Sequence, residues 1–187
     1  MITSSSEPLC TIEELRGICM FPSGGFQEFP TQDCDEVYSG IFIGNDNSAT
    51  DFAFLDRNNI GYVLNAAHGL DSRLNMIEPV TEREYAARGI RFLGIPAVDC
   101  MSYPIDQHFD EAIQFIREAL QSGKCVLVHC KQGISRSAAL VLAYLIVEQR
   151  MPAQEATRIV RQGREIMPND GFLMQLCNLN EMVNKRY

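Results

Sequence analysis

A short segment places a cysteine and an arginine at opposite ends of one loop between an apolar run and an apolar helix. Residues 124–129 are largely apolar and β-branched, as in a buried strand, and residues 137–147 are apolar on nearly every side, as in a central helix. The loop between them begins at Cys130 and ends at Arg136, where a helix N-terminus follows. Free backbone N–H groups and the positive end of the helix dipole favour an anion there. The segment therefore predicts a phosphate-binding loop that carries a thiol.

The residue types of this loop suit phosphate chemistry. Arg136 has a planar guanidinium that can hold two phosphate oxygens at once. A thiol between a helix N-terminus and a guanidinium is stabilised as thiolate, with a pKa of roughly 3.5 to 7.5 in such settings. We therefore expect Cys130 to be a nucleophile at neutral pH, with loop amides surrounding the phosphate oxygens. The residues expected to supply that phosphate site are Lys131, Gln132, Gly133, Ile134 and Ser135.

The context of this cysteine and arginine, more than their spacing, carries the prediction. Cys10 and Arg16 have the same spacing, but two glutamates lie between them, no glycine is present and the stretch is typical of a helix. Cys130 instead follows a predicted strand, and Gly133 lets the backbone turn toward a ligand. The alternative for the second pair is a buried structural cysteine beside a solvated Arg136.

The segment from His129 to Ser137 resembles the signature loop of the cysteine-dependent protein phosphatases. The resemblance extends over about residues 33–184 and is closest to the small, atypical dual-specificity phosphatases of the VHR type. It implies a phosphatase acting on phosphotyrosine and on phosphoserine or phosphothreonine in proteins, with mitogen-activated protein kinases as a substrate class. Pseudophosphatase relatives lack the nucleophile, whereas Cys130 is present here. The other segments that carry the resemblance are residues 36–45, 63–67, 143–145 and 168–172.

A cysteinyl phosphatase also needs a proton donor for the leaving oxygen, and two aspartates compete for this role. A positioned carboxylic acid contributes roughly a hundred- to ten-thousandfold. Asp99 follows a strand predicted near residues 91–96, which places it on the same carboxyl edge as Cys130, and the resemblance gives its position the same role. Asp106 falls in the first turn of the next predicted helix, where a carboxylate complements the dipole. We expect Asp99 to be the acid.

Three further side chains have an expected functional role beside an ordinary structural one. His129 is expected to orient the loop and the thiolate, which is compatible with a core histidine. Ser137 is expected to donate a hydrogen bond to the thiolate when the phosphocysteine is hydrolysed, and a helix N-cap is the alternative. By the resemblance, Arg164 binds a second phosphate on a doubly phosphorylated peptide; the alternative is that it complements a helix C-terminus together with Arg161.

Periodicity predicts an α/β fold in one domain, with a central, mostly parallel sheet and helices on both faces. Residues 1–30 are expected to form an arm packed on a catalytic domain of residues 31–187. Thr11 and Glu14 make a capping box that opens a short helix in this arm. The expected strands lie near residues 36–43, 61–66, 91–96 and 124–129, and the expected helices near 48–58, 107–121, 137–149, 153–163 and 170–184.

The composition limits which partners and which cellular locations are expected for this chain. With 46% hydrophobic and 21% charged residues the chain is an ordinary globular one, and no apolar run is long enough to span a bilayer. Its net charge of -8 disfavours nucleic acid and anionic membranes as partners and does not steer phosphorylated substrates inward, so their binding must be local. Seven cysteines without a CxxC pair or a signal peptide predict free thiols, no zinc site, and a cytoplasmic or nuclear location. The sequence does not predict the oligomeric state.

The predicted reaction has two steps through a phosphocysteine. No metal or other cofactor is expected, because the loop amides and Arg136 supply the positive charge that magnesium supplies in kinases. Two other functions stay open. Lys131 resembles the basic loops of inositide phosphatases, which usually carry a second cation where Ile134 stands, so a non-protein phosphomonoester is one alternative. A non-catalytic phosphoprotein-binding module is the other.

Overall fold

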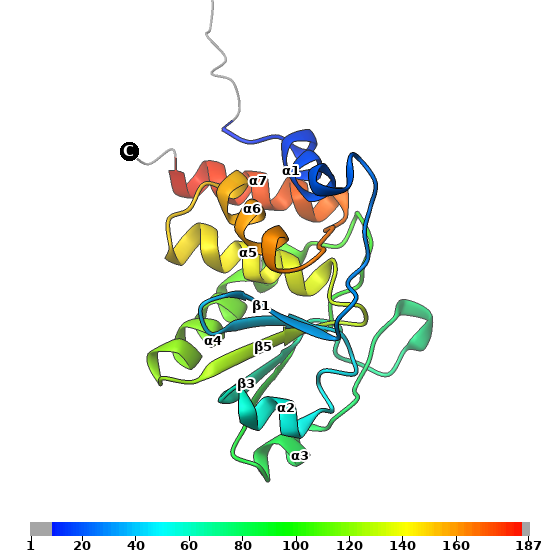
Figure 1. The fold of residues 1–187 in the computed structure, drawn as a ribbon, viewed down its shortest axis with the longest axis vertical. Helices are drawn as coiled ribbons and strands as arrows, with labels where there is room; N and C mark the ends of the chain where they lie inside the picture. Colours follow the sequence, from blue (N-terminus) through cyan, green and yellow to red (C-terminus); the bar gives the residue numbers. More distant parts are fainter. Residues whose placement is uncertain (1–8, 185–187) are drawn as a thin grey trace, which may run out of the picture.

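A computed structural model describes residues 9–184 and contains a five-stranded sheet with helices on both faces (Figure 1). β1 is antiparallel to β2, and all other neighbouring strands are parallel. The predicted α/β class with a mostly parallel sheet is therefore confirmed. In the order in which they lie in the sheet, the strands are β1 (Cys34–Tyr38), β2 (Ile41–Gly44), β5 (Cys125–His129), β3 (Ile60–Asn65) and β4 (Arg91–Gly94).

Alternation along the strands builds a separate core on each face of the sheet. Successive side chains of a strand point to opposite faces, so Val126 and Val128 of β5 join a large core while Leu127 joins a smaller one. Helices α2 (Phe52–Arg57) and α3 (Glu82–Ala86) cover the smaller core. The large core is covered by α1 (Ile12–Met20), α4 (Phe109–Gln121), α5 (Arg136–Glu148), α6 (Ala153–Gly163) and α7 (Asp170–Asn184). Three short 3-10 helices complete the described elements: η1 (Phe21–Ser23), η2 (Ser72–Leu74) and η3 (Ile105–His108).

Helix α5 passes through the large core and fixes the loop that precedes it. All of its residues from Arg136 to Ile146 are buried, which explains why the sequence is apolar around the whole helix. α4 is instead amphipathic, with Phe109, Ile113 and Ile116 buried on one face as the spacing predicts. Because α5 is enclosed on all sides, its N-terminus is held rigidly against the carboxyl edge of the sheet.

The segment predicted as one strand near residues 36–43 is in fact a hairpin. The chain reverses at Gly40, which has a φ of 76° and whose absent Cβ would lie 2.9 Å from the Leu120 side chain. Ser39 and Gly40 form a serine–glycine pair, which is a turn signal, inside an otherwise continuous apolar run. The hairpin adds β1 as an antiparallel edge strand, so the residues that follow it in β2 start the parallel part of the sheet.

Two other helices differ from the prediction. α2 begins only at Phe52, because the Asp51 side chain accepts a hydrogen bond from the amide of Phe54 and so caps the helix. α3 was not predicted, although Thr81 and Glu84 form a complete capping box at its start. Both helices are short and lie over the smaller core, away from the loop of residues 130–135.

The N-terminal arm packs on α6 and α7. α1 begins at the capping box of Thr11 and Glu14, as predicted. Arg16 forms an ion pair with Asp170 of α7 at 2.7 Å, so its spacing from Cys10 has no part in a phosphate site. Residues 1–8 of the predicted arm and 185–187 of the predicted catalytic domain lie outside the described residues, and the division near residue 30 stays a prediction.

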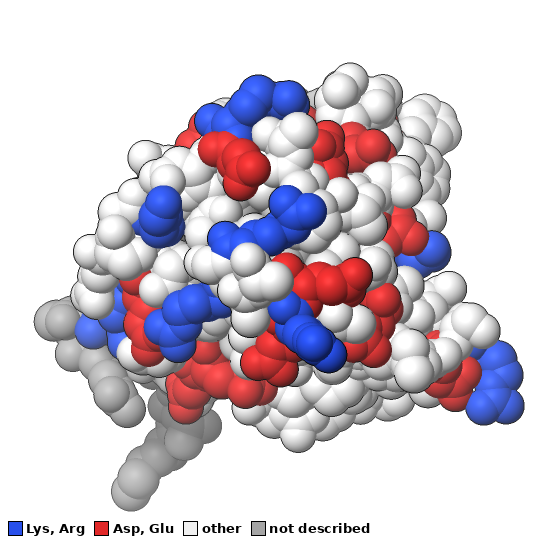
Figure 2. All heavy atoms as spheres, turned by 90° about the horizontal axis from the view of Figure 1, so that it is seen from below, with Lys and Arg blue, Asp and Glu red and all other residues white. Residues whose placement is uncertain are grey.

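Charges of both signs are interspersed on the surface. Figure 2 shows Lys and Arg lying among Asp and Glu on the face seen from below, without a separate basic area. The same mixture gives ion pairs elsewhere, such as Arg117 with Glu148 at 2.6 Å. No helix within residues 9–184 has both the length and the apolar character needed to cross a membrane.

Candidate active site

The loop that joins β5 to α5 closes around the sulfur of Cys130. Gly133 adopts a φ of 67°, and a Cβ there would lie 2.5 Å from the carbonyl oxygen of Gly44, so the position requires glycine. The Gly133 amide points inward and donates to the Cys130 sulfur at 3.3 Å. Above the sulfur lies a cavity of about 380 Å³, whose lining includes Cys130, Lys131, Gln132, Ile134, Ser135 and Arg136.

The surroundings of Cys130 favour its thiolate. The side chain is buried, and the buried Ser137 Oγ lies 3.3 Å from the sulfur. Burial alone would raise the pKa of this thiol. The positive charge of Arg136 and the hydrogen bonds from Ser137 and Gly133 outweigh burial, and the pKa is lowered from its ordinary value. A buried cysteine is thus placed where it ionises more readily than an exposed one.

Arg136 is held by hydrogen bonds through Nη1, while its Nε lies 3.7 Å from the Asp99 carboxylate, beyond hydrogen-bond distance. Its Nη1 donates to the carbonyl oxygens of Asn75 and Ala97, each at 3.1 Å. Its Nε is buried and has no hydrogen-bond partner among the described residues. A buried donor without a partner costs about 1–3 kcal/mol. An anion in the cavity would satisfy this donor, so the guanidinium is oriented for phosphate before any ligand arrives.

Asp99 faces the same cavity, on the loop that follows β4. Its Oδ1 accepts hydrogen bonds from Ser135 Oγ and Asn169 Nδ2, both at 2.8 Å. Its Oδ2 makes no such bond and lies 3.7 Å from the Nε of Arg136. One carboxyl oxygen is therefore anchored, while the other is open to the cavity that contains Cys130.

The competing carboxylate lies elsewhere. Asp106 is in the first turn of η3, its backbone amide donates to Gln175, and its side chain is not among those that line the cavity. The structure therefore brings Asp99, and not Asp106, to the nucleophile. β4 ends at Gly94, earlier than predicted, so a loop and not the strand itself carries Asp99.

Arg164 supports the loop from behind. Its buried guanidinium donates from Nε to the carbonyl oxygen of Gly133 at 2.8 Å and from Nη2 to that of Gln132 at 3.2 Å. Its Nη1 forms an ion pair with Asp35 of β1 at 2.5 Å. The prediction that Arg164 binds a second phosphate is wrong, because its side chain has no exposed surface and all three nitrogens are occupied.

Comparison with known proteins identifies the fold and the site together. Residues 41–182 match the family model for the dual specificity phosphatase catalytic domain. The chain belongs to the dual-specificity phosphatase family. This phosphatase is 41% identical over 152 residues to human dual specificity protein phosphatase 26, which covers 81% of this chain and 69% of that protein. The bovine protein of the same name has the same identity and coverage.

Solved structures agree with this assignment. Human DUSP28 superposes on the phosphatase with a TM-score of 0.72 at 24% identity, over 84% of this chain and 99% of that one, which supports the fold. The human tyrosine phosphatase-like serine/threonine/tyrosine-interacting protein superposes with a TM-score of 0.68 at 30% identity, over 80% of this chain and 96% of that one. The predicted resemblance to small, atypical dual-specificity phosphatases is confirmed.

Ser137 and His129 flank the nucleophile of this phosphatase in different ways. Ser137 lies inside α5, which begins at Arg136, so the N-cap alternative is wrong and its hydroxyl is directed to the sulfur. His129 ends β5 and is buried; burial lowers the pKa of its ring to about 4, so the ring is neutral at physiological pH. No described side chain forms a hydrogen bond with that ring, and its orienting role stays a prediction.

Two further basic side chains named in the sequence analysis, Lys131 and Arg161, are both engaged in ion pairs. Lys131 forms an ion pair with Asp46, which the sequence analysis did not single out. Arg161 is buried, unlike Lys131; it pairs with Glu28 of the arm and donates from Nε to the carbonyl oxygen of Cys19 at 2.7 Å. These arginine and lysine side chains thus hold segments of the phosphatase together.

Asn169 is a functional residue that the sequence analysis missed. Besides holding Asp99, its Oδ1 accepts a hydrogen bond from the amide of Phe172 at 3.1 Å, in the first turn of α7. An asparagine directly before a predicted helix is a typical N-cap, so this part of its role could have been predicted from the sequence. Its contact with Asp99 joins residues far apart in the sequence. The next residue but one, Gly171, touches the same loop, because a Cβ there would lie 1.9 Å from the carbonyl oxygen of Met101.

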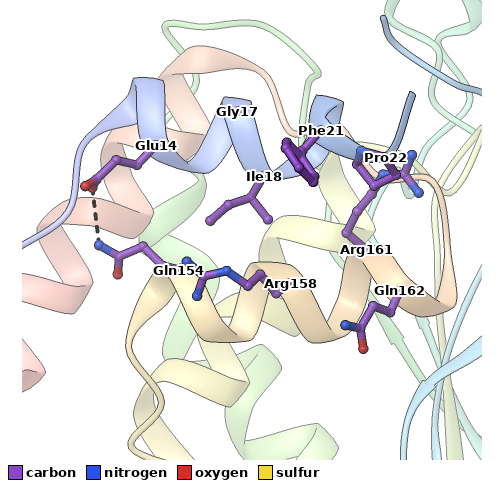
Figure 3. A pocket seen from close by; sticks show the side chains of 9 residues that line it. All are labelled: Glu14, Gly17, Ile18, Phe21, Pro22, Gln154, Arg158, Arg161 and Gln162. Carbon is purple, nitrogen blue, oxygen red and sulfur yellow. Dashed lines mark hydrogen bonds between the residues drawn. The ribbon is translucent and has the colours of Figure 1, made fainter. Parts of the chain in front are cut away.

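A larger hollow of about 590 Å³ lies between α1 and α6 and has different chemistry. Figure 3 shows Ile18 pointing from α1 into the space between the two helices, with Arg158 along the α6 side and Phe21 near the end of α1. None of its lining residues is a cysteine or a histidine. Within residues 9–184, no group of three or more His, Cys, Asp or Glu side chains is placed to hold a metal ion.

Proposed function

We propose that this phosphatase hydrolyses phosphotyrosine and phosphoserine or phosphothreonine in proteins through a phosphocysteine intermediate. The observation that carries the proposal is the buried Nε of Arg136, a donor without a hydrogen-bond partner among the described residues, beside a thiol whose pKa is lowered. A phosphate ester supplies both missing elements, an anion for the guanidinium and an electrophile for the sulfur.

In the first step the Cys130 thiolate attacks phosphorus, an S–P bond forms, and the P–O bond to the substrate breaks. Arg136 and the amides of residues 131–135 hold the three equatorial oxygens. Asp99 gives a proton to the departing oxygen from Oδ2, since Ser135 and Asn169 hold Oδ1. The substrate leaves as a neutral phenol or alcohol.

In the second step water attacks the phosphocysteine, the S–P bond breaks and phosphate is released. Asp99, now ionised, takes the proton of the attacking water. The hydroxyl of Ser137, 3.3 Å from the sulfur, donates a hydrogen bond to the thiolate that departs. The proposed mechanism uses no metal, because Arg136 and the loop amides supply positive charge to the phosphoryl oxygens.

The substrates are proposed at the level of their class. A catalytic domain of this length has no room for long loops that deepen a pocket, so phosphothreonine should reach Cys130 as well as phosphotyrosine. Mitogen-activated protein kinases are a proposed substrate class on the basis of the resemblance to the VHR type. The described cysteines are all free thiols, which fits the proposed cytoplasmic or nuclear location.

An inositide substrate is the second candidate, and the ion pair of Lys131 bears on it. Lys131 pairs with Asp46, and Ile134 supplies no second cation, so the loop offers little free positive charge to additional phosphates. A protein substrate, with a single phosphate in the cavity, is therefore favoured.

Turnover on matched substrates tests the proposed function. We would measure kcat/KM on a small aryl phosphate, on phosphotyrosine and phosphothreonine peptides of one sequence, and on a panel of inositides, with Cys130→Ser as the control for contaminating activity. We expect hydrolysis of all but the inositides. Hydrolysis of inositides with no action on either peptide would show that the substrate is an inositide and not a protein. Binding of the phosphopeptides without turnover would indicate a phosphoprotein-binding module.

A further inference from the structure

Large apolar side chains are exposed on the arm at one edge of the catalytic cavity. Gln27 of the arm lines the cavity together with Cys130. Its neighbours Phe26 and Phe29 are 75% and 61% exposed. The segment is fastened on both sides of Gln27: Ser23 donates a hydrogen bond to the carbonyl oxygen of Phe26, and Glu28 pairs with Arg161 of α6. Both phenylalanines are thus presented by a chain segment that is held in place.

The other edges of the cavity repeat the pattern. Asn75, which lines the cavity and accepts a hydrogen bond from Arg136, directly follows Leu74, which is 42% exposed. Met101, two residues after Asp99, is 68% exposed. Figure 1 places the arm (blue) and the segment of residues 66–79 (blue-green) on the same side of the sheet, beside the end of β5. Phe26, Phe29, Leu74 and Met101 are called the apolar rim below.

The four exposed side chains of the apolar rim each lie within two residues of a residue that lines the cavity, so they are not scattered at random over the surface. Single exposed apolar residues are normal, whereas contiguous ones mark interaction sites. Burying a phenylalanine or methionine fully is worth about 1.5–3 kcal/mol, so a partner that covers part of the apolar rim gains free energy that the isolated protein leaves unused. The partner expected to cover the apolar rim is the substrate whose phosphorylated residue enters the cavity.

The charges around the cavity do not favour a substrate with acidic residues next to the phosphorylated one, because such residues are usually bound by free lysine or arginine side chains. Among the described residues that line it, the two cations are Lys131 and Arg136. Lys131 is paired with Asp46, Arg136 is directed to the reacting phosphate, and the nearby Arg164 is buried. The net charge of -8 adds long-range repulsion for acidic segments. A second phosphate or a flanking glutamate therefore finds no free cation among these lining residues.

We propose that the apolar rim is a docking surface for the residues on either side of the phosphorylated one, and that it selects apolar and aromatic neighbours over acidic ones. The proposal rests on the proposed function, because it requires a peptide substrate. It places specificity on the arm, on the segment of residues 66–79 and on the loop that carries Asp99, through side chains that have no part in bond breaking.

The test uses two phosphotyrosine peptides that are identical except for the two residues on each side of the phosphotyrosine, leucine and phenylalanine in one and glutamate in the other. A small aryl phosphate serves as the reference substrate. We expect the full chain to prefer the apolar peptide by about tenfold in kcat/KM, which corresponds to partial burial of one large side chain. In the double variant Phe26→Ser, Phe29→Ser, the ratio of apolar-peptide to aryl-phosphate kcat/KM should fall by about the same factor.

Phe21→Ser is the matched control, because Phe21 is 83% exposed but lines the hollow between α1 and α6 (Figure 3). It should leave all three rates unchanged. Equal rates on the two peptides, a preference for the acidic one, or an equal effect of Phe21→Ser on the peptide ratio would overturn the inference while leaving the proposed function intact. Failure to hydrolyse even the aryl phosphate would overturn the proposed function, and the inference with it.

Discussion

The two sides of the phosphate loop are built in opposite ways. Behind the loop, Arg164 and Asp35 are paired and the carbonyl oxygens of the loop have donors. In front of it, Phe26 and Met101 are exposed to solvent. Buried charges are costly unless every partner is present, so the rear network tolerates few changes, whereas the front surface is free to vary. The support of the phosphate loop and the proposed choice of substrate therefore depend on different side chains, although Met101 lies only two residues from the acid Asp99.

Loss of the nucleophile should have the largest effect. Cys130→Ser replaces a thiolate with a hydroxyl that is not ionised at neutral pH, so turnover on every substrate should fall to below about 1% of the wild type. Phosphate should still bind, because Arg136 and the loop amides remain, and a thermal shift with phosphate measures this. Cys10→Ser is the control and should keep normal activity. Residual turnover of several per cent in Cys130→Ser would rule out the covalent mechanism.

Removal of the acid should come next and should depend on the leaving group. Asp99→Asn should lower kcat by roughly a hundred- to ten-thousandfold on a phosphothreonine peptide and much less on an activated aryl phosphate, because an alkoxide needs the proton more. Asp106→Asn is the matched control and should change little. A larger loss in the Asp106 variant would transfer the acid role to that residue.

The pH dependence of activity tests the lowered pKa of Cys130. Activity should rise with pH as the Cys130 thiolate forms, and this limb should lie at lower pH than for an ordinary thiol, because Arg136 and the hydrogen bonds to the sulfur lower the pKa of the thiol against the effect of burial. Asp99→Asn should leave this rising limb in place, because the limb reports the thiol and not the carboxyl group. The measurement is kcat/KM on an aryl phosphate as a function of pH.

Arg164 tests the rear network directly. Arg164→Met leaves Asp35 without its partner and two loop carbonyls without donors, which should lower the free energy of unfolding by about 3 kcal/mol or more. A urea unfolding curve measures this. Because the loop loses its support, kcat/KM should fall by the same factor on singly and doubly phosphorylated peptides. A loss confined to the doubly phosphorylated peptide would restore the second-phosphate role.

The smallest effect is expected far from the loop. Arg16 and Asp170 form a half-exposed ion pair, and such pairs contribute little. Arg16→Ala should therefore leave kcat/KM on an aryl phosphate within about twofold of the wild type. A large loss would mean that the arm helix, and not only the segment around Gln27, supports the catalytic cavity.

Sequence reasoning succeeded where the signal was local. The loop from Cys130 to Arg136, the capping box of α1 and the enclosed helix α5 each reside in one short segment, and each lies where it was predicted. It failed where a contact joins distant segments. No local sequence pattern indicates that Arg164 points toward β1 and not toward a ligand. Its partner Asp35 lies in a hairpin, and the sequence pattern predicted a single strand there.

Three consecutive residues at the start of α7 serve three different regions. Asn169 holds the carboxyl group of Asp99, Asp170 pairs with Arg16 of the arm, and Gly171 lies against the carbonyl of Met101. Each residue of a helix is turned by about 100° from the one before it. Inserting one residue between Asn169 and Asp170 would therefore separate the contact to Asp99 from the other two, so the spacing at this junction couples the acid to the arm.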